Sequence, residues 1–271
     1  MSPFLTLPFG HTRLCLASDD PAVMTYAFGR YGRYVSIDAP TAHLRVSTGH
    51  AYDPLTAVPV AWTDDEQGWS GRSGALRATF DPASGMGTAL VTGDPDGLPS
   101  AVENVLRGIG ARLLARDGQL LVHAGGVVLD GRLVVFYGPS GVGKTTIARL
   151  AAAAGLPVAG DDLLVLDPVS GHGGGSPFWG DGADLTPAIG WWPLHSIWRL
   201  EQAPVARQDK LAGAAAAAEL LCQVPLPASY VPQLLEGVAR LVPAVPHGRL
   251  CLPRPQAWQD VQEVAFGNHV F

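Results

Sequence analysis

Short apolar runs, several of them alternating with polar residues, occupy the first third of the chain. They lie at residues 5–7, 12–16, 42–47, 75–80 and 88–92. A period of two is typical of strands with one buried face, and clusters of Gly, Pro and Asp separate these runs as turns would. The runs at 76–79 and 89–92, joined across residues 81–87, have the pattern of a hairpin. We therefore predict that residues 1–98 form a small, mainly antiparallel β region.

One segment with the apolar spacing of a helix follows the β-rich region. Ser100 and Glu103 have the spacing of a capping box, and apolar residues then recur three and four positions apart until Gly118. A glycine after the last apolar position is a typical helix end. We predict one amphipathic helix here, at the start of a second domain that comprises residues 99–271.

Three apolar strands are predicted next, and the dipeptide Asp130-Gly131 joins two of them. The apolar runs lie at residues 120–123, 127–129 and 133–137. Asp-Gly between two such runs is a strong signal for a two-residue hairpin, so the third strand should run antiparallel to the second. This pattern disfavours GTPase-like and RecA-like sheets, in which the corresponding strand arrives from a helix.

The remaining pattern predicts an α/β fold with a mixed sheet. Helices are expected at 145–154, 211–222 and 230–241, and strands at 156–159, 163–166, 196–200 and 249–252. Residues 168–190 are rich in Gly, Pro, Asp and Ser, so we predict a mobile loop. This loop is either a linker or an active-site flap, and both interpretations stay open.

The segment GPSGVGKTT carries the strongest chemical signal of the chain. It fits the phosphate-loop template G-x-x-x-x-G-K-[ST] and lies between a predicted strand and a predicted helix. Backbone N–H groups of such a loop and the positive end of the following helix bind polyphosphate. On the template, Lys144 contacts the β- and γ-phosphates and the Thr145 hydroxyl binds Mg²⁺. The predicted nucleotide-binding residues are Gly138, Ser140, Gly141, Val142, Gly143, Lys144, Thr145 and Thr146.

An acidic pair and a histidine are the next candidates. Asp161 and Asp162 follow a short predicted strand, where a Walker-B-like carboxylate would meet the metal and the phosphates. Two adjacent carboxylates can divide the work, one binding Mg²⁺ and the other accepting a proton. His123 ends the first of the three apolar strands and is either a phosphate or nucleophile contact or a structural histidine.

Composition and charge restrict the classes of partner. The 271 residues are 47% apolar, which is enough for a packed core, and the net charge is -6 without any run rich in Lys or Arg. These values argue against nucleic-acid and membrane-surface binding. The chain has no apolar run of the ~20 residues that a membrane span needs and no signal-peptide pattern at its start, so we expect a cytoplasmic protein. Cys15, Cys222 and Cys251 are scattered and predict reduced, structural thiols.

Residues 121–166 resemble the HPr kinase/phosphorylase family and, more distantly, phosphoenolpyruvate carboxykinase. The similar segment reads LVHAGGVVLDGRLVVFYGPSGVGKTTIARLAAAAGLPVAGDDLLVL, and the stretch PLHSIWRLEQ at 193–202 is similar to the family pattern PL-x-x-I-x-x-LEQ. The resemblance implies an HPr-kinase-like P-loop domain with ATP and Mg²⁺ as cofactors. It makes His123 an active-site histidine, Asp161 the proton acceptor and Asp162 the metal ligand beside Thr145.

The departures from this family change the expected substrate. The glycine-containing signature with a downstream acidic metal ligand and the usual amino-terminal domain of bacterial HPr kinases are not found, which argues against HPr itself. The chain resembles shorter HPr-kinase-like proteins that phosphorylate ribosomally made precursors, including lasso peptides, on a serine hydroxyl. The resemblance therefore implies a serine kinase for a peptide or protein, with residues 1–98 as a docking region and with homo-oligomers expected. A small-molecule hydroxyl kinase and a nucleotide-binding regulatory module without transfer remain alternatives, and the sequence does not distinguish ATP from GTP.

Overall fold

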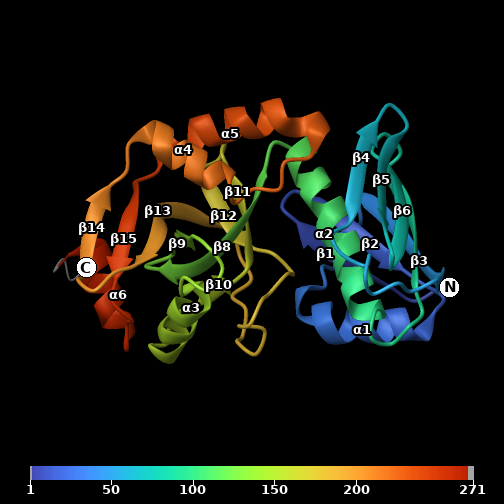
Figure 1. The fold of residues 1–271 in the computed structure, drawn as a ribbon, viewed down its shortest axis with the longest axis horizontal. Helices are drawn as coiled ribbons and strands as arrows, with labels where there is room; N and C mark the ends of the chain where they lie inside the picture. Colours follow the sequence, from blue (N-terminus) through green and yellow to red (C-terminus); the bar gives the residue numbers. More distant parts are fainter. Residues whose placement is uncertain (1, 268–271) are drawn as a thin grey trace. The chain divides into compact units, whose positions relative to one another are not determined.

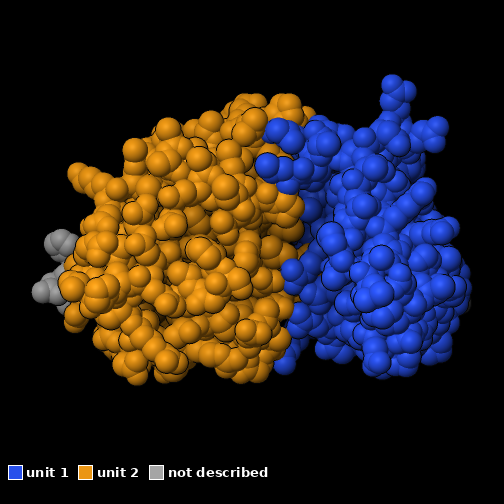
Figure 2. Space-filling view, viewed as in Figure 1, with its two compact units in different colours: residues 1–117, 226–231 blue, residues 118–225, 232–271 orange. Residues whose placement is uncertain are grey.

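A computed structural model of the chain describes residues 2–267 and divides it into two compact units (Figure 1). Unit 1 comprises Met1–Asp117 and Leu226–Val231, and unit 2 comprises Gly118–Pro225 and Pro232–Phe271 (Figure 2). The boundary differs from the one predicted between residues 98 and 99, because the long helix that follows belongs to unit 1. Residues 1 and 268–271 of the two predicted domains lie outside the described part.

Unit 1 is a seven-stranded sheet whose strand order is β1-β2-β3-β7-β6-β5-β4, with two helices packed against it. Its elements are β1 (Phe4–Phe9), β2 (Thr12–Ala17), α1 (Pro21–Tyr31), η1 (Gly32–Tyr34), β3 (Ala42–His50), β4 (Ala61–Asp65), β5 (Gly68–Ser73), β6 (Leu76–Asp81), β7 (Met86–Thr92), α2 (Leu98–Arg116) and η2 (Ala228–Tyr230). In β6, Leu76, Ala78 and Phe80 are buried while the residues between them are exposed, as the alternation predicts. The predicted hairpin is confirmed, since β6 and β7 pair antiparallel with Leu76 opposite Val91.

Two features of unit 1 differ from the prediction. The pairs β2–β3 and β3–β7 are parallel. The unpredicted helix α1 connects β2 to β3, and strands β4 to β6 lie along the chain between β3 and β7. The predicted capping box is wrong: α2 begins at Leu98, and the Ser100 hydroxyl donates to the Gly97 carbonyl from inside the first turn. Pro99 explains the earlier start, since proline fits the first turn of a helix, where its missing N–H is not needed.

Unit 2 contains an eight-stranded mixed sheet. Its elements are β8 (Leu120–Leu129), β9 (Arg132–Tyr137), α3 (Lys144–Ala153), β10 (Val158–Gly160), β11 (Leu163–Asp167), β12 (His172–Gly175), β13 (Trp192–Gln202), β14 (Arg207–Lys210), α4 (Gly213–Leu221), α5 (Val231–Ala244), β15 (His247–Leu252) and α6 (Trp258–Phe266). The order is β10-β8-β11-β12-β13-β15-β14, and β9 pairs with both β8 and β13. The α/β class with mixed sheets is thus confirmed. No helix within residues 2–267 has both the length and the apolarity to cross a membrane.

The hairpin before the loop helix is present as predicted. Strands β8 and β9 pair antiparallel from Leu129 opposite Arg132, and the two turn residues, Asp130 and Gly131, have φ values of 48° and 73°. On its other side β9 pairs parallel with β13, which pairs parallel with β15. The carboxyl ends of these three strands therefore lie at one edge of the sheet.

The glycine-rich segment 168–190 is more ordered than predicted. Its residues His172–Gly175 form β12, which pairs with β11 and β13. A Cβ on Gly173 would lie 2.7 Å from a Leu166 methyl carbon, so the absence of a side chain allows this strand to pack closely. The Gly, Pro, Asp and Ser content of this segment predicted a loop, because composition carries no information about backbone pairing with β11 and β13.

Candidate functional site

The segment 138–143 forms a tight loop between β9 and α3. Three of its glycines have positive φ: 149° at Gly138, 77° at Gly141 and 120° at Gly143. Gly138 also lies against β13, since a Cβ there would be 3.2 Å from the Leu200 carbonyl oxygen. Glycine is required where the backbone takes this conformation and is approached so closely. The result is the strand–loop–helix geometry that presents backbone N–H groups to an anion.

Lys144, the first residue of α3, points back into this loop. Its side chain is buried, and Nζ donates to the carbonyl oxygens of Gly138 at 3.0 Å and Pro139 at 3.3 Å. Burial lowers the pKa of Lys144, whereas the charges of Asp162 and Asp161 act in the opposite direction. A buried ammonium whose hydrogen bonds go to neutral carbonyl groups is costly, and an anion in the loop would stabilise it.

Asp161 is a buried carboxylate with three hydrogen-bond donors around it. It is 2% exposed, and it accepts hydrogen bonds from the Thr145 hydroxyl at 3.0 Å, from the Gly180 N–H at 2.9 Å and from the Gly182 N–H at 2.7 Å. Three donors around one carboxylate fix its orientation. Asp161 therefore connects the first turn of α3 with the segment that contains Gly180 and Gly182.

Arg149 holds that segment from the exposed side of α3. Its guanidinium donates through two nitrogens to the Asp184 carboxylate, each at 2.8 Å, and to the Asp181 carbonyl at 2.7 Å. We name residues 180–184 the strap. Of the two interpretations left open for residues 168–190, this contact with Asp161 supports a role at the site rather than a linker.

Asp162 and His123 form the second half of the site. The Nε2 atom of His123 lies 3.3 Å from Oδ1 of Asp162, and both side chains are partly exposed, 38% and 20% respectively. Strand pairing explains their proximity, because β11 pairs antiparallel with β8 and the Ala124 N–H donates to the Asp162 carbonyl. Asp162 is thus the more accessible of the two adjacent carboxylates.

These groups surround a cavity of about 340 Å³. It is lined by the loop and first helical turn, by both aspartates and His123, and by the start of the strap: His123, Ser140, Gly141, Gly143, Lys144, Thr145, Thr146, Asp161, Asp162, Gly180 and Asp181. Of the predicted site residues, Gly138 lies under Lys144 and Val142 lies on the other side of the loop. All the others line this one cavity.

The sequence left the segment that contains the strap open as a linker or a flap, and it identified no individual residue of the strap. Gly180 and Gly182 act through their backbone N–H groups, and Arg149 is an exposed helical residue without a motif of its own. The Gly-Asp-Gly sequence at 180–182 has the composition of an ordinary turn and gave no residue-level signal.

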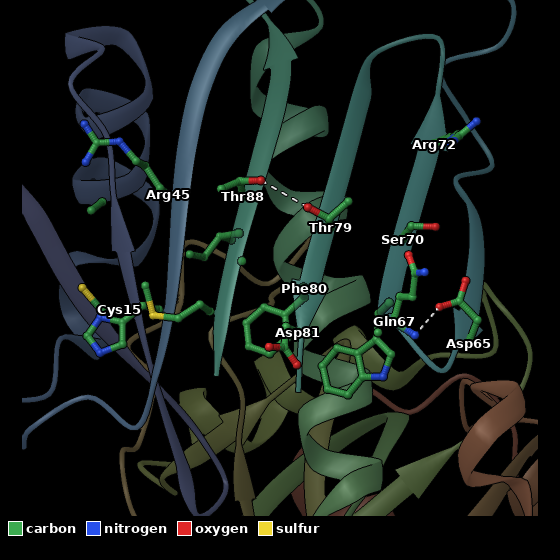
Figure 3. A pocket seen from close by; sticks show the side chains of 17 residues that line it. Cys15, Arg45, Asp65, Gln67, Ser70, Arg72, Thr79, Phe80, Asp81 and Thr88 are labelled. Carbon is green, nitrogen blue, oxygen red and sulfur yellow. Dashed lines mark hydrogen bonds between the residues drawn. The ribbon is translucent and has the colours of Figure 1, made fainter. Parts of the chain in front are cut away.

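A larger cavity, of about 720 Å³, lies on the sheet of unit 1, but fewer of its polar groups are available to a ligand (Figure 3). Its polar groups largely bond one another: the Thr79 and Thr88 hydroxyls are 3.2 Å apart, and Asp65 accepts from the Gln67 N–H. Asp81 is held within its own turn by Ser84. The cavity beside the loop is therefore the candidate site, although it is smaller.

The comparisons with known proteins neither extend nor contradict this assignment. No protein-family model matches the chain, and no curated protein matches it. The case for function therefore depends on the residues and their geometry.

Proposed function

We propose that this protein is a Mg²⁺-dependent ATP kinase with an HPr-kinase-like P-loop domain, which transfers the γ-phosphoryl group to a serine hydroxyl of a peptide or protein. One observation carries the proposal: Lys144, the Thr145–Asp161 pair and the Asp162–His123 pair converge on one cavity beside a glycine-rich loop. The resemblance of residues 121–166 supports the serine acceptor, with a ribosomally made precursor such as a lasso peptide as the substrate class. Such an enzyme would use the ATP of the cytoplasm.

The metal side of the site fits Mg²⁺. Thr145 Oγ1 and Asp161 Oδ2 are 3.0 Å apart and line the phosphate cavity, and Mg²⁺ prefers such oxygen ligands. Within residues 2–267 no group of three or more His, Cys, Asp or Glu side chains is arranged to hold a metal. Mg²⁺ bound with a nucleotide needs only one or two carboxylates, because phosphate oxygens supply further ligands. The ion would neutralise charge on the β- and γ-phosphates.

The geometry favours an exchange of the two aspartate roles that the resemblance implied. Asp161 is buried, accepts three hydrogen bonds and contacts Thr145, so it suits the metal side. Asp162 is more accessible and lies beside His123, so it suits proton acceptance. In the reaction the acceptor oxygen bonds to the γ-phosphorus, the bond from phosphorus to the β,γ-bridging oxygen breaks, and the hydroxyl proton passes to Asp162. The loop N–H groups and Lys144 stabilise the charge of the departing ADP.

Mass spectrometry tests the transfer. The protein is incubated with Mg·ATP and a library of single-serine peptides, with matched serine-to-alanine peptides as controls. A phosphoryl mass gain on serine peptides alone is the expected result. Phosphorylation of free serine without any peptide product would favour the small-molecule kinase, and ADP formation without a phosphorylated acceptor would favour the regulatory module.

We expect the affinity for Mg·ATP to fall as pH rises. The decline should begin at a pH below the ordinary pKa of a lysine side chain. Burial lowers the pKa of Lys144, and only its protonated form attracts phosphate, so affinity is full below this pKa and is lost above it. Calorimetry between about pH 7.5 and about pH 10 measures this, with Lys144→Arg as the comparison because arginine stays charged. A flat profile for the wild type, or an equal decline in Lys144→Arg, would contradict the expectation.

Substituting Gly182 with alanine should weaken Mg·ATP binding by about 10- to 100-fold, as loss of support for a metal ligand typically does. The new Cβ would lie 2.7 Å from Asp161 Oδ2, so the carboxylate or the strap must move. Gly213→Ala is the matched control, because nothing lies within 4 Å of a Cβ there. Calorimetry with unchanged affinity in Gly182→Ala would show that the strap does not position Asp161.

A further inference from the structure

A second cavity of unit 2 adjoins the phosphate loop on the side away from the aspartates. Its volume is about 640 Å³, and it shares Gly141, Gly143 and Thr146 with the cavity that contains Lys144. Its walls are the outer side of the loop and first helical turn, the end of β13 with the residues that follow it (200–204), and the end of β15 with the residues that follow it (252–255). A volume of this order is typical of small-molecule sites.

The sheet topology explains why this cavity lies beside the loop. Strands β9, β13 and β15 are parallel neighbours, with Tyr137 opposite Arg199 and Gln202 opposite Leu252. Their carboxyl ends meet at one edge, and ligands of α/β sheets bind at such edges. The end of β9 carries the phosphate loop, so the ends of β13 and β15 line the space next to it.

The walls combine apolar surfaces with a few polar groups. Val142, Ile147, Leu200, Leu252 and the prolines Pro204, Pro253 and Pro255 supply the apolar part. The Ala203 N–H donates to the Leu252 carbonyl at 2.9 Å and joins the two segments, while Gln202 Nε2 donates to the Gly141 carbonyl at 3.3 Å. This wall is therefore connected to the phosphate loop itself.

Arg254 gives the cavity a planar cation at its rim. Within residues 2–267 the structure shows no carboxylate paired with this guanidinium, which is exposed and lines the cavity. Glu201, in contrast, is held by Arg199 at 3.0 Å and Arg249 at 3.3 Å. A free guanidinium beside rigid apolar walls suits a flat aromatic ring, because arginine stacks on such rings.

We propose that this cavity binds the nucleoside, base and ribose, of the nucleotide whose phosphates occupy the loop. The inference depends on the proposed function, since it needs phosphates in the loop, and it adds the residues that distinguish a nucleotide from bare polyphosphate. The shared residues Gly141, Gly143 and Thr146 mark where the α-phosphate connects the two cavities.

Calorimetry with two probes, Mg·ATP and Mg·tripolyphosphate, tests the inference. The wild type should bind Mg·ATP about tenfold or more tightly than Mg·tripolyphosphate, because only ATP fills the second cavity. Ala203→Trp, which fills the cavity, should remove this preference and leave tripolyphosphate affinity within about twofold of the wild type. Arg254→Ala should weaken Mg·ATP alone by about three- to tenfold. Arg207→Ala, an exposed arginine of β14 outside the cavity, is the control and should change neither affinity.

Each outcome has a distinct meaning. Equal affinities of the wild type for both probes, or variants that weaken both probes alike, would overturn the nucleoside site and leave the phosphate loop in place. Failure of the wild type to bind either probe would overturn the proposed function as well. Retained tripolyphosphate binding reports that a variant is folded, and if Ala203→Trp does not fold, Arg254→Ala decides.

Discussion

Replacing Lys144 with alanine should reduce phosphoryl transfer by at least about 10²–10³-fold, the loss typical when a charge-stabilising donor is removed. In the described residues, Lys144 is the one lysine side chain that lines the cavity beside the glycine-rich loop. Its ammonium donates to loop carbonyls, which phosphate oxygens would replace in the proposed complex. Mg·ATP affinity should fall with it. The fold should persist, because burial already disfavours the charged form of this side chain.

The matched control is Lys210→Ala. The chain contains only these two lysines, and Lys210 is exposed on β14, where it does not line the cavity. Transfer rate, nucleotide affinity and thermal unfolding are measured for both variants. We expect unfolding midpoints within a few degrees of the wild type, about the shift caused by 1 kcal/mol. A folded Lys144→Ala protein with undiminished transfer would refute the assigned role of the loop.

The two aspartates should fail in different ways when each is changed to asparagine. Asp162→Asn should keep Mg·ATP affinity while transfer falls by about 10²–10⁴-fold, since the proton acceptor beside His123 is lost. Asp161→Asn should lose nucleotide affinity as well. Three donors converge on the Asp161 carboxylate, and an asparagine there would point an N–H₂ group at some of them.

Affinity and single-turnover rate, measured side by side, distinguish this assignment from the one the resemblance implied. If Asp161→Asn binds Mg·ATP normally and only transfer is lost, Asp161 is the proton acceptor and the exchange of roles is wrong. A double variant, Asp162→Asn with His123→Asn, adds a second criterion. Residues that act as a unit are not additive, so the double variant should transfer about as slowly as Asp162→Asn alone.

The strand-to-loop-to-helix segment was predictable because its signals are local. The template around Lys144, the hairpin at Asp130-Gly131 and the helix that follows the loop each depend on residues close in sequence. The same holds for the alternation in β6, which indicates one buried face. The position of the α2 start was missed by three residues because Ser100 and Glu103 resemble a cap without acting as one.

The sequence by itself determined the glycine-rich loop between β9 and α3, the pair of adjacent aspartates, the hairpin and the mixed α/β class, because these follow from local backbone preferences and short spacings. Only the tertiary structure decided that Asp161 is buried beneath the strap while Asp162 remains accessible beside His123. It also decided that β13 and β15 end beside the loop and enclose a second cavity. These features depend on strand pairing and on backbone N–H donors far apart along the chain, and residue identity does not encode such pairings locally.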